Sequence, residues 1–368
     1  MPLLRALLSN LPTLSHPLLL TTAIALISLP FLYFHFKIFP KPTRYLTLLY
    51  RRKILGHTIP ISVNYHFTRV CNAACKFCFH TELTGYHAPL PTAQNALRLL
   101  AESGMRKLNF AGGEPFLYPK HLGQLCKFAK EELQLESVSI VSNGTRVSEQ
   151  WLANWGAWID ILAISCDSMK AETNQLIGRA ERTTGVPFDN VTQLFRIRDW
   201  CRKFGVRFKL NTVVCAKNWE EDMVDVVSEL APFRWKVFQV LVVDGENENE
   251  TRRRDARSMV VTDEEFGWFC RRHKGVKGFT PEPNRLMRAS YLILDEYLHF
   301  LDAGNDKRKH SDPILEVGVQ KALSQVEWDE QAFNERGGVY DWSRDAGGNG
   351  KTACSGELGG VKLSDLEF

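Results

Sequence analysis

From Ile61 onward, short apolar runs alternate with longer segments in which apolar residues recur at helical spacing. This alternation is typical of β–α units, in which parallel strands form a sheet and helices cover it. The expected helices Thr92–Ser103 and Asn190–Phe204 are each followed by a glycine, which commonly ends a helix because it accepts positive φ. The six apolar runs are Ile61–Val70, Lys107–Ala111, Ser137–Ser142, Asp160–Ser165, Arg207–Val214 and Trp235–Val243.

Polar or glycine-rich segments follow these runs, where the chain would leave the sheet. The first run leads into a cysteine-rich loop and the second into Gly112–Pro115, while the third and fourth end near Asn143 and Ser165. In β/α barrels the carboxyl ends of the strands meet at one mouth that carries the active site. The sequence therefore predicts an α/β fold with functional residues gathered at that mouth.

The loop after the first run contains Cys71, Cys75 and Cys78, spaced C-x3-C-x2-C. Three thiolates this close can bind three irons of a [4Fe–4S] cluster and leave the fourth iron open to a small molecule. This spacing is typical of radical S-adenosylmethionine (SAM) enzymes. A zinc site is the alternative, with His80 as the fourth ligand that zinc usually takes. The remaining six of the nine cysteines are scattered, a pattern that fits a reducing compartment.

The turn after the second run reads Gly-Gly-Glu-Pro, which is the motif that holds the methionyl amino group of SAM in radical SAM proteins. Its glycines lack side chains, so a ligand can approach the backbone closely. Later strand ends place polar groups for the ribose or carboxylate oxygens of SAM, and Arg179 can pair with the methionyl carboxylate. The expected SAM residues are Gly112, Gly113, Glu114, Pro115, Asn143, Ser165 and Arg179.

Cations and amides alternate along three of the expected strands, so that they share one face of the sheet. Burying lysine is costly unless it is paired, and four cations from three strands would make an anion pocket suited to several phosphates. The alternative is that these side chains lie near strand ends and reach water. The six residues are Lys107, Asn109, Lys209, Asn211, Arg234 and Lys236.

The N-terminal segment differs from the rest of the chain. From Ala6 to Phe36 it contains no Lys, Arg, Asp or Glu. This uncharged run is long enough to span a bilayer, and basic residues follow it. Those residues favour a cytosolic location for the following domain. A cleaved secretory signal, a membrane hairpin and an interfacial helix are alternatives, the last two because Pro30 interrupts the run. The net charge of +4 gives no reason to expect a nucleic-acid partner.

Between His57 and Trp342 the chain resembles the viperin-like family of radical SAM enzymes. The resemblance is carried by six long motifs in addition to the cysteine spacing. They are Cys78–Thr81, Asn109–Phe116, Val138–Gly144, Ile161–Ser168, Arg234–Gln239 and Ser290–Tyr297.

The resemblance implies a partial (β/α)6 radical SAM barrel over residues 53–250. A hydrophobic membrane anchor and basic linker would occupy residues 1–52, a C-terminal extension that closes the active site residues 251–345, and a flexible tail residues 346–368. The anchor would hold the protein on the cytosolic face of a membrane, either the endoplasmic reticulum or a lipid droplet.

The resemblance also implies the reaction. Members of this family use a [4Fe–4S] cluster and SAM to take the hydrogen from ribose carbon 4′ of CTP. The product is the 3′-deoxy-3′,4′-didehydro nucleotide, a chain terminator for polymerases. The six cation and amide residues match nucleotide-pocket positions, and Tyr291 matches a proposed proton or hydrogen donor. An electron donor protein would be a partner.

Several departures from the family pattern leave the substrate open. Ala111 stands where serine is expected, and Ala180–Asn190 forms a longer loop. UTP is therefore an alternative to CTP, as is a different nucleotide or a nucleotide sugar. The alternative to an enzyme is a membrane adaptor with a structural cluster. The absence of a second three-cysteine set argues against a guanosine-nucleotide reaction of the kind used in molybdenum-cofactor synthesis.

The last three residues, Leu366–Phe368, resemble the C-terminal tripeptide of proteins that receive clusters from the cytosolic iron–sulfur assembly machinery. An exposed end can offer an aromatic anchor and a carboxylate in one small unit. The alternative is a disordered end with an incidental phenylalanine.

We expect deletion of Phe368 to lower the iron content of protein isolated from cells, because the assembly machinery would lose its anchor. Chemical reconstitution of the same variant should restore the cluster fully. Equal cellular iron in the two forms would contradict this role for the terminus.

Overall fold

The computed structural model describes residue 47 and residues 50–81, 84–243, 246–248, 250–302 and 310–344. Most of the expected anchor and the whole tail, including Phe368, lie outside the described residues. Among the residues that are described, no helix is long and apolar enough to cross a membrane. The chain divides into two units, residues 1–59 and residues 60–368, and the second carries all the features below.

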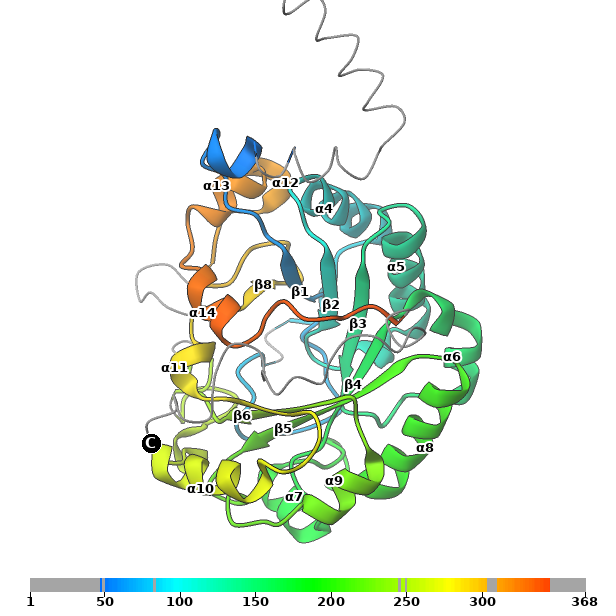
Figure 1. The fold of residues 1–368 in the computed structure, drawn as a ribbon, viewed down its shortest axis with the longest axis vertical. Coiled ribbons are helices and arrows are strands. Elements are labelled where there is room, and N and C mark those ends of the chain that lie inside the picture. The colour runs from blue at the N-terminus through cyan, green and yellow to red at the C-terminus, as the bar shows by residue number, and fades with distance from the viewer. Residues whose placement is uncertain are drawn as a thin grey trace, which may run out of the picture. The chain divides into compact units, whose positions relative to one another are not determined.

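The second unit is built on a sheet of eight parallel strands in the order β7-β6-β5-β4-β3-β2-β1-β8 (Figure 1). All six predicted strands are present, and they form the consecutive centre of the sheet. Their bounds and those of the two additional strands are β1 Ser62–His66, β2 Lys107–Ala111, β3 Ser137–Ser142, β4 Ile161–Ser165, β5 Arg207–Val214, β6 Arg234–Gln239, β7 Phe279–Glu282 and β8 Leu292–Leu294.

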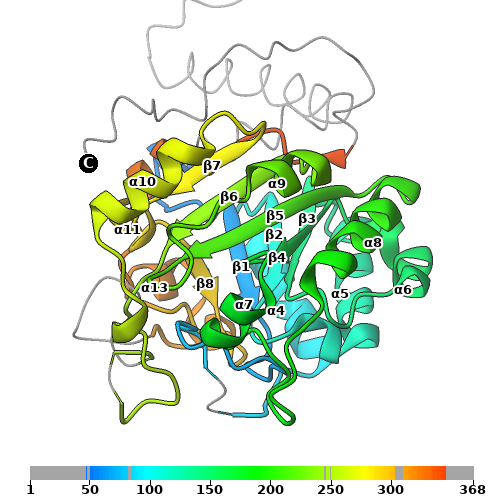
Figure 2. The same ribbon diagram turned by 90° about the horizontal axis from the view of Figure 1, so that it is seen from below.

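Helices cover the outer, convex face of the curved sheet (Figure 2). The two helices predicted from the sequence are present, and Gly104 and Gly205 follow them with φ of +107° and +65°. The helices that follow successive strands are α4 Leu90–Glu102, α5 Pro119–Glu131, α6 Glu149–Trp155, α7 Ala171–Ile177, α8 Asn190–Lys203 and α9 Val224–Leu230. Those of the C-terminal region are α10 Asp263–His273, α11 Asn284–Met287, α12 Ile314–Val317, α13 Val319–Leu323 and α14 Glu330–Glu335.

The strand register aligns polar side chains on the inner, concave face. Asn64 of β1 lies opposite Asn109 of β2, which lies opposite Ser139 of β3. Asn109 Nδ2 donates to Asn64 Oδ1 at 2.9 Å, and Ser139 Oγ donates to Asn109 Oδ1 at 2.8 Å. This chain of hydrogen bonds holds three side chains of neighbouring strands along the inner face.

The two edge strands were not predicted. On one edge, Leu292–Leu294 pairs with β1 as β8, and Leu298 then turns the chain with φ of +69°. On the opposite edge, β7 contains Pro281, which cannot donate a backbone hydrogen bond and is tolerated at a sheet edge.

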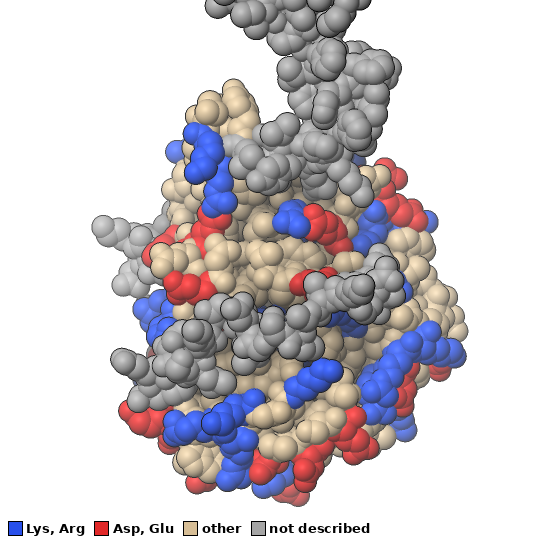
Figure 3. Space-filling view, in the orientation of Figure 1, with Lys and Arg blue, Asp and Glu red and all other residues tan. Residues whose placement is uncertain are grey.

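The segment after α14 returns across the sheet (Figure 1). It contacts the first residues of two strands: Ser137 Oγ donates to the carbonyl of Trp342 at 3.2 Å, and Arg207 donates to the carbonyl of Asp341 at 2.6 Å. The C-terminal extension therefore closes the amino ends of the strands. On the face drawn in Figure 3, Lys and Arg side chains are interspersed with Asp and Glu rather than gathered into one positive field.

Candidate active site

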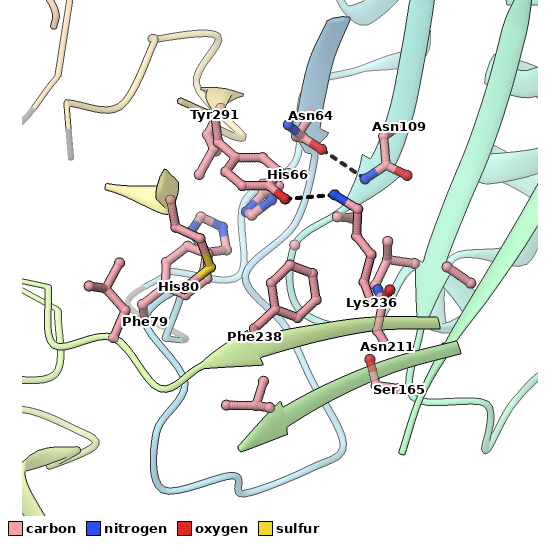
Figure 4. Close-up of a pocket in the computed structure, with 18 of the residues that line it drawn as sticks. Asn64, His66, Phe79, His80, Asn109, Ser165, Asn211, Lys236, Phe238 and Tyr291 are labelled. Atoms are coloured by element: carbon pink, nitrogen blue, oxygen red, sulfur yellow. Dashed lines mark hydrogen bonds between the residues drawn. The ribbon is translucent and has the colours of Figure 1, made fainter. Parts of the chain in front are cut away.

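A cavity of about 420 Å³ lies against the concave face of the sheet and receives side chains from six central strands and the segments beyond them (Figure 4). The cysteine loop follows the carboxyl end of β1, whereas Lys107 is the first residue of β2 and Lys209 the third of β5. The cavity therefore extends along the strands, with cysteines at one end and lysines at the other. The predicted residues that line it are Cys71, Cys75, Cys78, Gly112, Gly113, Asn143, Ser165, Arg179, Lys107, Asn109, Lys209, Asn211, Lys236 and Tyr291.

Backbone contacts hold the cysteine loop in place. The amides of Ala74 and Lys76 donate to the carbonyls of Gly178 and Ile177 at 3.2 and 2.9 Å. Burial raises the pKa of the Cys71 thiol to about 12 and that of the Cys75 thiol to about 11. The thiols of the metal-free loop are therefore protonated at neutral pH, and iron must displace these protons when it binds.

The donor set fits a [4Fe–4S] cluster. All three cysteines line the same cavity, as does Phe77. Among the described residues, no three His, Cys, Asp or Glu side chains converge on a single metal position. A cluster does not require such convergence, because each thiolate binds a different iron.

The Gly-Gly turn packs against residues 68–70, which lead into the cysteine loop. The amides of Gly113 and Glu114 donate to the carbonyls of Thr68 and Val70 at 2.7 and 2.8 Å. A Cβ atom at Gly113 would lie 2.0 Å from the carbonyl oxygen of Val70. Besides leaving room for a ligand, the glycines are thus required because two backbone segments of the protein meet here.

Glu114 and Pro115, which are also predicted SAM residues, are not among the residues that line the cavity. The Glu114 carboxylate is fully buried and accepts hydrogen bonds from Ser142 Oγ and the Asn143 amide, both at 2.8 Å. Pro115 begins a short 3-10 turn, Pro115–Leu117, and is also buried. Glu114 therefore fixes the end of β3, and direct contact of Glu114 or Pro115 with SAM stays a prediction.

Two more of the predicted SAM residues are held by protein partners on one side. Asn143 Nδ2 donates to Asn72 Oδ1 at 2.8 Å, which directs the Asn143 side chain toward the cysteine loop. Arg179 Nε donates to the buried Asp167 carboxylate at 2.5 Å. Arg179 also lines the cavity, so its remaining N–H groups are close enough to serve a ligand carboxylate.

The lysine end of the cavity is rich in positive charge. Burial lowers the pKa of Lys107 to about 7 and strongly lowers that of Lys209. Within the described residues, neither lysine has a carboxylate at salt-bridge distance; Lys107 Nζ instead donates to the hydroxyl of Tyr340 at 2.9 Å. Buried cations without matching anions favour an anionic ligand.

Arg234 departs from its predicted place. Its guanidinium lies 4.2 Å from the ring centre of Tyr340, and Arg234 is not among the residues that line the cavity. Its charge lies close to the lysine end through Tyr340, which lines the cavity, and contact of Arg234 with a nucleotide stays a prediction. Its Nε is buried without a hydrogen-bond partner.

Sequence reasoning missed several residues of the site. Asn64 and His66 alternate along β1 and point into the cavity (Figure 4). Period-2 alternation in the first strand could have identified both. Glu282, Arg336 and Tyr340 come from the C-terminal extension, and no local pattern in the sequence marks them.

Comparisons with known proteins agree with this geometry. Residues 65–253 match the radical SAM superfamily. Relatives named S-adenosylmethionine-dependent nucleotide dehydratase RSAD2 are 49% identical in Danio rerio, over 78% of this chain and 79% of that protein, and 48% identical in Oncorhynchus mykiss, over 77% and 81%. A relative from Flammeovirga pacifica, named S-adenosylmethionine-dependent nucleotide dehydratase, is 35% identical over 78% of this chain and 98% of that protein.

Solved structures show the same fold at low identity. Streptococcus suis SuiB bound to S-adenosylmethionine aligns with a TM-score of 0.55 at 17% identity, over 77% of this chain and 69% of that one. The enzyme anSMEcpe with bound AdoMet aligns with a TM-score of 0.56 at 13% identity, over 71% and 77%.

The parallel half-barrel, the three-cysteine loop and the Gly-Gly-Glu-Pro turn together define a radical SAM enzyme, whose cofactors are SAM and a [4Fe–4S] cluster. Within that class, the chain belongs to the viperin family of S-adenosylmethionine-dependent nucleotide dehydratases. Membership of this class favours a cluster over zinc in the cysteine loop, and ligation by Cys71, Cys75 and Cys78 stays a prediction.

We expect Gly113→Ala to destabilise the protein by about 1–3 kcal/mol, because the added methyl group would force apart the turn and Val70. Iron retention after reconstitution should fall with it. Gly85→Ala is the matched control, since a Cβ there meets nothing within 4 Å. Thermal unfolding and iron analysis of both variants test this, and equal behaviour of the two would contradict it.

Proposed function

We propose that this enzyme dehydrates a pyrimidine ribonucleoside triphosphate, CTP in the first place, to its 3′-deoxy-3′,4′-didehydro analogue. The observation that carries the proposal is a pair of cavity lysines without carboxylate partners in the described residues, the buried Lys107 and the half-buried Lys209, in the cavity that also contains the cysteines. The names of the relatives, which are nucleotide dehydratases, support the same class of reaction.

The charge at the lysine end suits a triphosphate better than a monophosphate. Lys107, Lys209 and Lys236 line the cavity from three different strands, and Arg234 stands behind them. Each lysine can donate charge-assisted hydrogen bonds to a separate phosphate oxygen. We infer that the triphosphate lies here and that the nucleoside extends toward the cysteine end.

Between the two ends, amide groups face the cavity at the level where a ribose would lie. Asn64 and Asn109 are bonded to each other, and Asn211 Oδ1 is buried without a hydrogen-bond partner among the described residues. A ribose hydroxyl is a donor of the right kind for that oxygen. Asn211 is therefore the residue we assign to ribose recognition.

When bound, SAM and the cluster would supply a 5′-deoxyadenosyl radical that removes the hydrogen from ribose carbon 4′. The ribose radical then takes up one electron, and its 3′-hydroxyl leaves as water after accepting one proton, which forms the 3′,4′ double bond. A one-electron donor protein would deliver the electron. We assign the proton to the Tyr291 hydroxyl, whose oxygen lies 3.0 Å from Lys236 Nζ (Figure 4). Lys236 can return a proton to that oxygen, because burial lowers its pKa to about 7.

The test of the reaction class is a screen of the four ribonucleoside triphosphates with reconstituted enzyme, SAM and a chemical reductant. We expect CTP to stimulate formation of 5′-deoxyadenosine and of a product lighter by one water. UTP is the second candidate, because Ala111 removes one polar contact expected at the cavity wall. No stimulation by any nucleotide would exclude the proposed function.

We expect Lys209→Met to weaken binding of the triphosphate by about tenfold or more, because charge-assisted hydrogen bonds contribute roughly 1.5–3 kcal/mol each. SAM binding should change little, since SAM lies at the opposite end. Lys203→Met is the control, because that lysine is exposed and pairs with Glu149 outside the cavity. Calorimetry with CTP, CDP and CMP measures the effect, and wild-type activity on CMP would contradict the triphosphate assignment.

The affinity for triphosphate should depend on pH. In the free protein burial lowers the pKa of Lys107 to about 7, and a neighbouring phosphate raises it again by favouring the ammonium form. Binding therefore takes up a proton above pH 7, and this lysine should weaken affinity by up to about tenfold per pH unit as the pH rises beyond 7. Below pH 7 its contribution should be constant. Lys107→Arg keeps its charge and should flatten the profile; an unchanged profile in that variant would contradict this origin.

A further inference from the structure

Glu282, the last residue of β7, lies directly behind two of the residues that line the cavity. Its side chain is fully buried, accepts a hydrogen bond from the Tyr291 hydroxyl and forms an ion pair with Lys236. Lys236 Nζ also donates to the oxygen of Tyr291 at 3.0 Å. Glu282, Lys236 and Tyr291 thus form a closed triangle of hydrogen bonds, with Lys236 and Tyr291 exposed to the cavity.

The C-terminal extension completes this group. Arg336 Nη1 lies 3.7 Å from the Glu282 carboxylate, and the Arg336 guanidinium lies 3.7 Å from the ring centre of Tyr291. Arg336 Nε also donates to Ser290 Oγ at 2.7 Å, beside Tyr291 in sequence. Two cations therefore surround the one carboxylate, and together they keep it ionised despite its burial.

An ionised Glu282 decides how the Tyr291 hydroxyl is oriented. A phenol has a single hydrogen to donate, and here the Glu282 carboxylate accepts it. The phenol oxygen in turn accepts a hydrogen bond from Lys236 Nζ. The same carboxylate also decides how much of the charge of Lys236 is directed to the phosphates. A buried salt bridge that served stability alone would not need to include the hydroxyl of a cavity-lining tyrosine.

We propose that Glu282 is a positioning residue for the final proton transfer, acting through Tyr291 and Lys236. This inference rests on the proposed nucleotide dehydration. Glu282 holds the phenol oxygen and the ammonium side by side at the cavity. When the phenol hydrogen turns from the carboxylate to the leaving 3′-hydroxyl of the ribose, Lys236 supplies its replacement. Glu282 itself does not touch the substrate, because it does not line the cavity.

Wild-type turnover should form 5′-deoxyadenosine and the dehydrated nucleotide in a fixed ratio, and we expect this ratio to change in a Glu282 variant. Glu282→Gln keeps the shape of the side chain and removes its charge, so hydrogen abstraction should continue while completion of the product slows. We expect the ratio of 5′-deoxyadenosine to dehydrated nucleotide to rise by about tenfold or more. The Kd of cluster-free protein for CTP, measured by calorimetry, should stay the same or fall, because the cavity loses a negative charge.

A double-mutant cycle with Tyr291→Phe tests the route of the effect. If Glu282 acts through Tyr291, adding Glu282→Gln to Tyr291→Phe should leave product formation within about twofold of the single Tyr291 variant. Fully multiplicative losses would overturn the proposal, as would a wild-type product ratio in folded Glu282→Gln protein. A large loss of CTP affinity would overturn it in favour of a role in nucleotide binding alone.

Because loss of a buried anion can prevent folding, Glu282→Asp provides the second variant. This variant keeps the negative charge but moves it away by the length of one methylene group. We therefore expect the ratio of 5′-deoxyadenosine to dehydrated nucleotide to rise, but by less than in the Gln variant. A wild-type ratio in Glu282→Asp would overturn the proposal. Failure of the proposed function is recognised separately, because wild-type enzyme would then form no extra 5′-deoxyadenosine with any nucleotide.

Discussion

The excess of buried positive charge at one end of the cavity is the constraint on which the site depends. Lys107 is buried and Lys209 half-buried, neither has a carboxylate at salt-bridge distance among the described residues, and desolvation lowers the pKa of both. A protein that evolved for stability alone would replace such lysines by apolar residues. Their presence is explained by a ligand that brings the missing negative charge, and a chain of phosphates brings it most compactly.

The parallel register then decides where the rest of the ligand must lie. Lys107 begins β2 and Gly112 follows its last residue, so the two ends of the cavity are separated by roughly 16 Å of extended chain. A nucleoside triphosphate is of this length. In the proposed arrangement, phosphates at the amino ends of the strands would place the ribose near the carboxyl ends, beside the cysteine loop and the Gly-Gly turn predicted to hold the cofactors.

Much of this arrangement follows from local sequence, and some of it does not. The six central strands, two of the helices and the cysteine loop were predicted, because hydrophobic periodicity and ligand spacing are local properties. The edge strands were missed, since β8 has three residues and β7 has four with a proline. The role of Glu282 depends on pairing between β6 and β7 and on an arginine far along the chain, which no single segment records.

The C-terminal extension explains how these cations remain available to a ligand. Tyr340 stacks on Arg234 at 4.2 Å and covers Lys107 at 4.6 Å, while Trp342 lies 5.2 Å from the same lysine. Cation–π contacts of this kind contribute about 0.5–2 kcal/mol, less than a buried carboxylate would. Aromatic rings thus cover Lys107 and Arg234 without neutralising them. Only Lys236 among the three cavity lysines is paired with a carboxylate in the described residues, and that carboxylate is the one that also holds the tyrosine.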